Sequence, residues 1–198
     1  MQSWINPRYL DASVIVCEQE PFPHVSLQEF LLPERAEELR TALLQQEFKK
    51  KQADLFSFAQ TPDLLTVENP LIRSFLDMID SKEFHTWMEH VTGVQTTSID
   101  AFGALYGDCD YLLCHDDVVE GRNIAYILNL GKDFTEESGG ALALLDCDVQ
   151  GRPKNVVKRL VPAFNSFNFF VVSEKSHHMV EEILEEKERY SIGGWLRD

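Results

Sequence analysis

From Gly93 onward the sequence divides into short apolar runs separated by turn residues, and this pattern constrains the fold more than any other feature. Short runs rich in Val, Ile, Phe and Tyr are typical of β-strands. We expect eight strands, near residues 98–106, 111–117, 123–130, 141–147, 156–161, 166–173, 178–183 and 189–195. About eight short strands at this spacing favour a sandwich, a jelly roll or a barrel.

The residues before Gly93 carry helix signals instead. Pro33 suits a first helical position and is followed by acidic residues, which a helix N-terminus favours. Asn69-Pro70 is expected to open a second helix, and Ser81 to cap a third that ends at Gly93. Helices followed by strands favour an α+β fold, mainly β, with the helices packed outside the sheet.

At 198 residues the chain has the size of one compact domain. We expect a single domain over residues 1–198, with a helical part at about 27–93 and a barrel at about 97–196.

The segment Met179–Arg189 is ambiguous, because Val180, Ile183 and Leu184 have helical spacing with acidic residues between them. We interpret it as a β-hairpin with Val180 and Ile183 inward and an acidic turn near residues 185–188. A solvated charged helix remains the alternative. Lys49, Lys50 and Lys51 are expected in a solvated turn, with a lid as the alternative, and His24, His85 and His90 at the surface.

The charge balance excludes several classes of partner. The chain has 18 Lys+Arg and 33 Asp+Glu, a formal net charge of −15. Phosphate repels such a chain, so direct binding of nucleic acid or of an anionic membrane is not expected, whereas a basic protein or peptide would be attracted. No apolar run approaches the roughly 20 residues of a membrane span.

The cysteines and the N-terminus indicate the compartment. Residues 1–16 lack a basic start followed by an apolar core, so no secretory signal is visible. The four cysteines contain no C-x-x-C pair and are interpreted as reduced thiols, so a cytoplasmic protein is expected.

His115 and Asp117 are the first candidates for chemistry. Residues i and i+2 of a strand share a face, so an imidazole and a carboxylate would point the same way. With a second histidine they would form the 2-His-1-carboxylate set that holds non-haem Fe(II). His177 and His178 are the candidates for that ligand. The alternative is an exposed acidic loop with an incidental histidine.

Arg189 strengthens this interpretation. Arg189 and Ser191 share a strand face, and a guanidinium beside a hydroxyl suits a buried carboxylate. A metal with open positions near such a clamp fits an oxoacid cosubstrate. A surface ion pair with Glu186 or Glu188 is the alternative role of Arg189.

These residues follow a family pattern, H-x-D, a distal His and an Arg about ten residues later, here His115, Asp117, His178 and Arg189. The chain resembles the prolyl-hydroxylase branch of the Fe(II)/2-oxoglutarate dioxygenases, and within it the ribosomal-protein prolyl hydroxylases. Further stretches that carry the resemblance are 53–60, 112–117, 122–128, 139–142, 165–173 and 191–195.

The resemblance implies a double-stranded β-helix, a jelly-roll, cupin-like barrel with buttressing N-terminal helices. It implies Fe(II) on His115, Asp117 and His178, with 2-oxoglutarate and O2 as cosubstrates and ascorbate as a candidate reductant. Alignment with the family favours His178 over His177. The cosubstrate would be bound by Arg189, Tyr106, Ser191 and Asn129, where Asn129 replaces the family's usual tyrosine. The prolyl pocket would be shaped by Tyr111, Arg122 and Trp195.

The implied substrate is a prolyl residue in a basic protein loop, and the resemblance points to a small-subunit ribosomal protein. Eukaryotic members continue into a second, inactive barrel, whereas this chain ends at Asp198, so we expect either a single-barrel version or a shortened piece of a longer protein. The same chemistry on free proline or another small metabolite is one alternative. A catalytically silent module that binds peptides or senses 2-oxoglutarate is the other.

Overall fold

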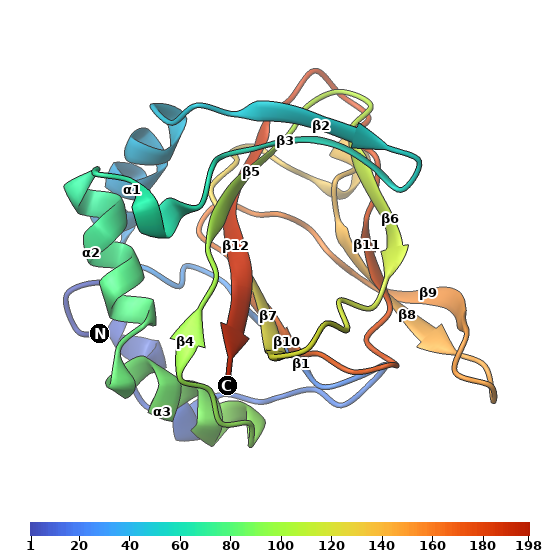
Figure 1. Cartoon of the computed structure of the whole chain (residues 1–198), viewed down its shortest axis with the longest axis horizontal. Coiled ribbons are helices and arrows are strands. Elements are labelled where there is room, and N and C mark those ends of the chain that lie inside the picture. Colours follow the sequence, from blue (N-terminus) through green and yellow to red (C-terminus); the bar gives the residue numbers. More distant parts are fainter.

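The computed structural model describes residues 1–198, and antiparallel strands make up most of its regular secondary structure. They follow one hydrogen-bonded path, β1-β10-β7-β12-β5-β3-β6-β11-β8-β9, with β2 added to β3 and β4 to β12. The path curls into the nearly closed barrel seen in Figure 1. The strands are β1 (His24–Leu27), β2 (Lys49–Ala53), β3 (Phe56–Gln60), β4 (Ser98–Ile99), β5 (Phe102–Tyr106), β6 (Tyr111–His115), β7 (Arg122–Asn129), β8 (Leu142–Cys147), β9 (Pro153–Leu160), β10 (Phe167–Val171), β11 (His178–Val180) and β12 (Arg189–Arg197).

Three α-helices cover one side of the barrel: α1 (Pro33–Leu44), α2 (Pro70–Ile79) and α3 (Lys82–Thr92). The Asn69 side chain caps α2 by accepting from two backbone N–H groups, and Ser81 caps α3. Gly93 ends α3 at a left-handed φ of 75°. The expected helix boundaries are therefore confirmed. Short 3-10 helices span Pro7–Tyr9, Ala12–Val14, Leu64–Thr66 and Glu136–Ser138.

Strand alternation divides the core into two sides. On β10, Phe167 and Phe169 belong to the large cluster beneath the helices, whereas Phe170 faces the barrel interior with Leu142 and Leu144. The helices thus bury the outer face of one sheet, and the inner faces of the strands are left to form a site. The expected α+β, mainly β, jelly-roll class with buttressing helices is confirmed.

The expected division into a helical front and a later barrel is wrong in one respect. Strands β1, β2 and β3 lie before α2, and β3 bridges the barrel by pairing with both β5 and β6. Lys49–Lys51 lie in β2 and not in a turn. Every residue of β2 is exposed, so this strand lacks the apolar alternation by which a sequence reveals a strand.

The segment after His178 is neither a helix nor a hairpin. Val180 and Ile183 are buried as expected, and residues 185–188 connect to β12. However, β11 pairs with β6 and β8, whereas β12 pairs with β4, β5 and β7. The two strands therefore belong to different parts of the barrel, an outcome set by long-range pairing.

Two of the three histidines expected at the surface are buried. His24 is 1% exposed and His85 is 7% exposed, and only His90 lies at the surface. His85 lies 2.7 Å from the Thr96 hydroxyl, a partner that becomes available only when the loop after α3 folds back. No helix of the structure has the length and apolarity to cross a membrane.

Candidate active site

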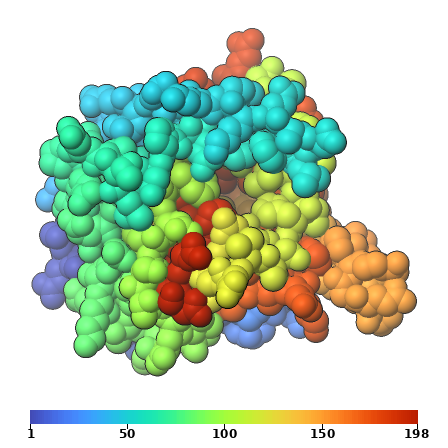
Figure 2. All heavy atoms as spheres, in the orientation of Figure 1, coloured from blue at the N-terminus to red at the C-terminus, as the bar shows by residue number.

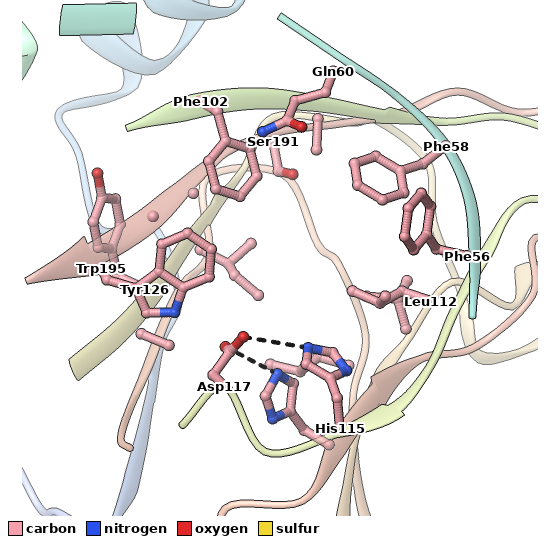
Figure 3. Close-up of a pocket in the computed structure, with 18 of the residues that line it drawn as sticks. Phe56, Phe58, Gln60, Phe102, Leu112, His115, Asp117, Tyr126, Ser191 and Trp195 are labelled. Atoms are coloured by element: carbon pink, nitrogen blue, oxygen red, sulfur yellow. Dashed lines mark ion pairs between the residues drawn. The ribbon is translucent and has the colours of Figure 1, made fainter. Parts of the chain in front are cut away.

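Three metal-ligating side chains converge at one end of the barrel interior: His115, Asp117 and His178. His115 and His178 are direct cross-strand partners on β6 and β11. Their Nε2 atoms lie 3.5 Å and 3.3 Å from the two carboxylate oxygens of Asp117 (Figure 3). The ligand atoms all lie within 4.8 Å of one another, a spacing that suits a single cation.

A β-bulge aims His115 into the barrel. His178 and Val180, two residues apart on β11, pair with His115 and Leu112, three residues apart on β6. The extra residue turns both Leu112 and His115 inward. Asp117 lies beyond the strand at a left-handed φ of 64°. The simple strand alternation expected for His115 and Asp117 is therefore wrong, although the two side chains do meet.

The hydrogen bonds behind the histidines select their tautomer. The Nδ1 atoms of His115 and His178 lie 2.8 Å and 2.7 Å from the backbone carbonyl oxygens of Leu113 and Ser176. A carbonyl oxygen can only accept, so Nδ1 carries the proton and Nε2 is free to bind a metal.

The charges of the three groups are coupled. Burial favours the neutral carboxyl of Asp117, but hydrogen bonds from His115 and His178 outweigh it and hold its pKa well below its ordinary value. Burial likewise opposes the charge on His115, yet its hydrogen bond to Asp117 leaves its pKa raised. The three groups together favour a positive charge between them, which a divalent cation supplies in place of protons.

The cluster opens into a cavity of about 420 Å³ in the barrel interior. Figure 2 shows the hollow on the surface, bordered by the β2–β3 segment, the loop after Asp117 and the end of β12. Most of the wall is apolar, and its aromatic residues are Phe56, Phe58, Phe102, Tyr106, Tyr126, Phe170 and Trp195. Figure 3 labels five of them, Phe56, Phe58, Phe102, Tyr126 and Trp195. Such a wall excludes water from a small number of polar groups.

Arg189 is the most unusual of those polar groups. It lines the cavity and is 1% exposed, yet it forms no ion pair with a carboxylate. Its Nη2 donates to Asn129 at 3.2 Å, its Nε has no partner, and its guanidinium lies 5.1 Å from the Tyr106 ring centroid. Burial lowers the pKa of Arg189. A buried cation without a counter-charge is costly, so this side chain is prepared for an anionic ligand.

The structure places most of the sequence-predicted residues on this cavity. Tyr106 is the cross-strand partner of Arg189, and burial raises its pKa to about 12, so it stays a neutral phenol. Ser191 also lines the wall. Arg122 stacks 3.4 Å above the Trp195 ring, and both residues line the cavity. The Nε–H of Arg122 and the indole N–H of Trp195 are buried and have no partner.

Two predicted residues lie off the cavity. Tyr111 pairs with Ser57 and precedes the bulge, so it does not share the inward face of Leu112. Asn129 is fully buried and hydrogen-bonded to Arg189 and Ser166, so a direct contact with a ligand in the cavity is not what the structure shows. His177 points elsewhere, with its Nε2 at 3.0 Å from the Gly151 carbonyl oxygen.

Sequence reasoning missed much of the aromatic wall. Phe56 and Phe58 come from β3, and Phe58 stacks on Tyr106 with ring centroids 5.0 Å apart. Their i, i+2 spacing was a signal for a strand face that points one way. Lys51 of the neighbouring strand reaches the same wall.

Comparison with known proteins identifies the family. The profile of the 2OG-Fe(II) oxygenase superfamily matches residues 102–197, the segment that contributes the whole triad and Arg189. This part of the chain belongs to that superfamily. The oxygenase segment comprises β5 to β12, and so it includes the bulge of β6 that aims His115.

Relatives and solved structures agree with the match to the 2OG-Fe(II) oxygenase superfamily. The chain is 38% identical over 185 residues to the prolyl 3-hydroxylase OGFOD1 of Xenopus laevis, covering 92% of this chain and 36% of the relative. The chain thus spans about a third of the length of that relative. A prolyl 4-hydroxylase from Pseudomonas putida superposes with a TM-score of 0.77 at 15% identity, covering 94% of this chain and 98% of the other.

A prolyl hydroxylase from Trichoplax adhaerens, solved with a hypoxia-inducible factor peptide, superposes with a TM-score of 0.75 at 16% identity. It covers 96% of this chain and 91% of the other. At such identities the two structures show a shared fold, the jelly-roll of 2OG oxygenases.

Proposed function

We propose that the chain is an Fe(II)- and 2-oxoglutarate-dependent dioxygenase that hydroxylates a prolyl residue in a protein. The observation that carries the proposal is the pairing, in one cavity, of a 2-His-1-carboxylate set with a buried Arg189 that has no counter-charge. The first group fits Fe(II), and the second fits the distal carboxylate of a dicarboxylic acid. Relatives of the chain that are prolyl 3-hydroxylases support the prolyl class of substrate.

The residues of the chain have distinct tasks in this mechanism. His115, Asp117 and His178 would hold the iron, which with 2-oxoglutarate and O2 supplies the oxidising power for C–H hydroxylation. Arg189 would bind the distal carboxylate, with Tyr106 and Ser191 beside it on the cavity wall. The apolar wall formed by Phe56, Phe58 and their neighbours excludes water from the reacting groups.

The substrate end of the cavity is assigned to Arg122 and Trp195. Both residues line the cavity and carry a buried N–H group without a partner, and each group can donate to a carbonyl oxygen of a peptide. The stacked guanidinium and indole fix each other in place. A backbone carbonyl next to the prolyl ring is a suitable acceptor, and the carboxylate of free proline is another, so the experiment must include both substrates.

The identity of the protein substrate remains part of the proposal. The net charge of −15 supports a basic loop, for which the small-subunit ribosomal protein implied by the resemblance is the first choice. Four unpaired cysteines support a cytoplasmic enzyme. Ascorbate is the reductant to include in the assay.

The deciding experiment offers the basic ribosomal loop, a neutral proline-containing peptide and free L-proline in parallel, with Fe(II) and 2-oxoglutarate. Mass spectrometry measures the added oxygen, and succinate is quantified separately. We expect a peptide to gain 16 Da, which is the mass of one oxygen, faster than free proline does. Faster oxidation of free proline would assign a metabolite hydroxylase, and cosubstrate binding without oxidation of any of the three would assign a silent module.

A further inference from the structure

A layer of buried polar side chains supports Arg189 from behind. Asn129 on β7 pairs in register with Ser191 on β12, and its backbone N–H donates to the carbonyl oxygen of Ser166 at 2.9 Å. Asn129 and Ser166 have no exposed surface, and Ser191 is 3% exposed. Buried amides and hydroxyls must find hydrogen-bond partners inside the protein, so the partners found here show how the Asn129 amide is oriented.

The hydrogen bonds of this layer run in one direction only. The Ser166 hydroxyl donates its single proton to the Ala163 carbonyl oxygen at 2.7 Å, and that oxygen has no proton to give. Toward Asn129 the hydroxyl can therefore only accept, and Asn129 Nδ2 lies 3.0 Å from it. The amide NH2 of Asn129 must face Ser166, and its Oδ1 must face the guanidinium of Arg189.

The chemical nature of this acceptor decides the electrostatics of the cavity. A neutral amide oxygen fixes the guanidinium without cancelling its charge. A carboxylate in the same place would form an ion pair with Arg189 and remove the field that attracts an anion. An asparagine therefore combines two properties that neither an aspartate nor an apolar residue provides.

We propose that Asn129 is a positioning residue that orients Arg189 and, being neutral, keeps its charge available for the distal carboxylate of the cosubstrate. Ser166 and the Ala163 carbonyl group set the direction of the Asn129 amide. The inference rests on the proposed function, because it takes a dicarboxylic acid as the ligand of Arg189.

The test compares Asn129→Asp with Asn129→Leu, two variants of similar size. The first supplies a counter-charge to Arg189, and the second removes the hydrogen bond and adds no charge. Binding of 2-oxoglutarate is measured by calorimetry on the Mn(II)-loaded protein without O2, and the melting temperature is measured without ligand. We expect affinity to fall in the order wild type, Asn129→Leu, Asn129→Asp, with a loss of about tenfold or more in Asn129→Asp.

The expected order of stability is different, which separates charge from packing. Asn129→Asp gains an ion pair with the buried guanidinium, so its ligand-free melting temperature should exceed that of Asn129→Leu. A purely structural role would make affinity follow stability, so weaker binding in Asn129→Leu than in Asn129→Asp would overturn the proposal. Wild-type affinity in Asn129→Asp would overturn it as well.

Ser166→Ala provides an independent variant should Asn129→Asp fail to fold. Without the hydroxyl the Asn129 NH2 loses its acceptor and the amide is held less firmly against Arg189, so 2-oxoglutarate affinity should fall several-fold. Unchanged affinity in Ser166→Ala would refute the role of Ser166 in orienting the Asn129 amide. Absence of 2-oxoglutarate binding in the wild type would instead refute the proposed function, so the two failures are distinguishable.

Discussion

His115 and His178 face each other across β6 and β11 with ring centroids 4.2 Å apart, and each ring donates its Nδ1–H to the carbonyl oxygen two residues before it. The two rings are thus fixed in the same tautomer by the same local device. In both cases the accepting carbonyl belongs to the same short segment as the histidine. Two of the three protein ligands of the candidate metal site are therefore already oriented by their own backbone segments.

Alanine variants of His115, Asp117 and His178 should each lose the metal. Loss of a hydrogen bond behind a metal ligand typically costs about 10- to 100-fold in affinity, and removal of a ligand should cost at least as much. The measurement is Fe(II) or Mn(II) stoichiometry after gel filtration. His177→Ala is the matched control and should retain the metal, because His177 points to Gly151. Full binding by any of the three variants would remove that residue from the site.

Arg189→Met should separate cosubstrate binding from stability. Loss of a buried charge-assisted pair should weaken 2-oxoglutarate binding by about 2–5 kcal/mol, which is roughly thirtyfold or more. The stability of the ligand-free protein should change little, because removal of a buried cation without a counter-charge offsets the loss of its hydrogen bond to Asn129. Calorimetry and thermal unfolding test the two halves. A variant that folds, binds metal and retains wild-type affinity would contradict the assignment.

Trp195→Phe should affect the peptide and not the cosubstrate. The variant keeps an aromatic ring beneath Arg122 but removes the unpartnered indole N–H of Trp195. Loss of one neutral hydrogen bond of about 0.5–1.5 kcal/mol should lower kcat/KM for the peptide by about 2- to 10-fold. Succinate formation without peptide should be unchanged. An equal fall in both rates would place Trp195 at the cosubstrate end.

Asp110 should make the stability of the β2–β3 segment depend on pH. Burial alone would raise its pKa, but hydrogen bonds from Lys50, Ser57 and the Gly107 N–H outweigh this and hold it below its ordinary value. A carboxyl group whose folded pKa is depressed stabilises the protein above its unfolded pKa of about 3.9 and loses that contribution as the pH falls through the folded pKa.

The variant Asp110→Asn measures this contribution. At pH 7 it should lower the free energy of unfolding by about 1–3 kcal/mol, and the difference from wild type should shrink as the pH falls below about 4. Asp108→Asn is the control, because Asp108 is exposed. A difference that stays constant from pH 7 to pH 3 would show that the ionised carboxylate contributes nothing.

Salt dependence tests the expected basic substrate. The chain carries −15 overall, but the cationic groups on the cavity wall other than the histidines are Lys51, Arg122 and Arg189. If the overall field guides a basic loop, kcat/KM should fall as ionic strength rises, because 0.1 M salt shortens its reach to about 10 Å. The neutral peptide is the control and should show little change. An equal response of both peptides would show that the effect of salt does not act through the charge of the peptide and would contradict the expected guidance.

Local signals in the sequence were sufficient for the helices and for the identity of the site. Asn69, Ser81 and Gly93 act on backbone groups within a few residues, so their capping roles are readable without a structure. The H-x-D pair, the distal histidine and Arg189 carried the family resemblance, and the structure brings all four to one cavity. Short-range chemistry and a fixed motif explain why these predictions agreed with the fold.

Only the tertiary structure decided how those residues are aimed. The bulge of β6 arises because two residues of β11 span three residues of β6. Strands β11 and β12 lie in different parts of the barrel because each pairs with strands distant in the sequence. The family resemblance implies that Asn129 binds the cosubstrate. Long-range strand pairing instead buries it behind Arg189, and Ser166, 37 residues away, orients its amide. Strand register and buried hydrogen bonds join residues far apart in the chain, and no local pattern encodes the partner that each will meet.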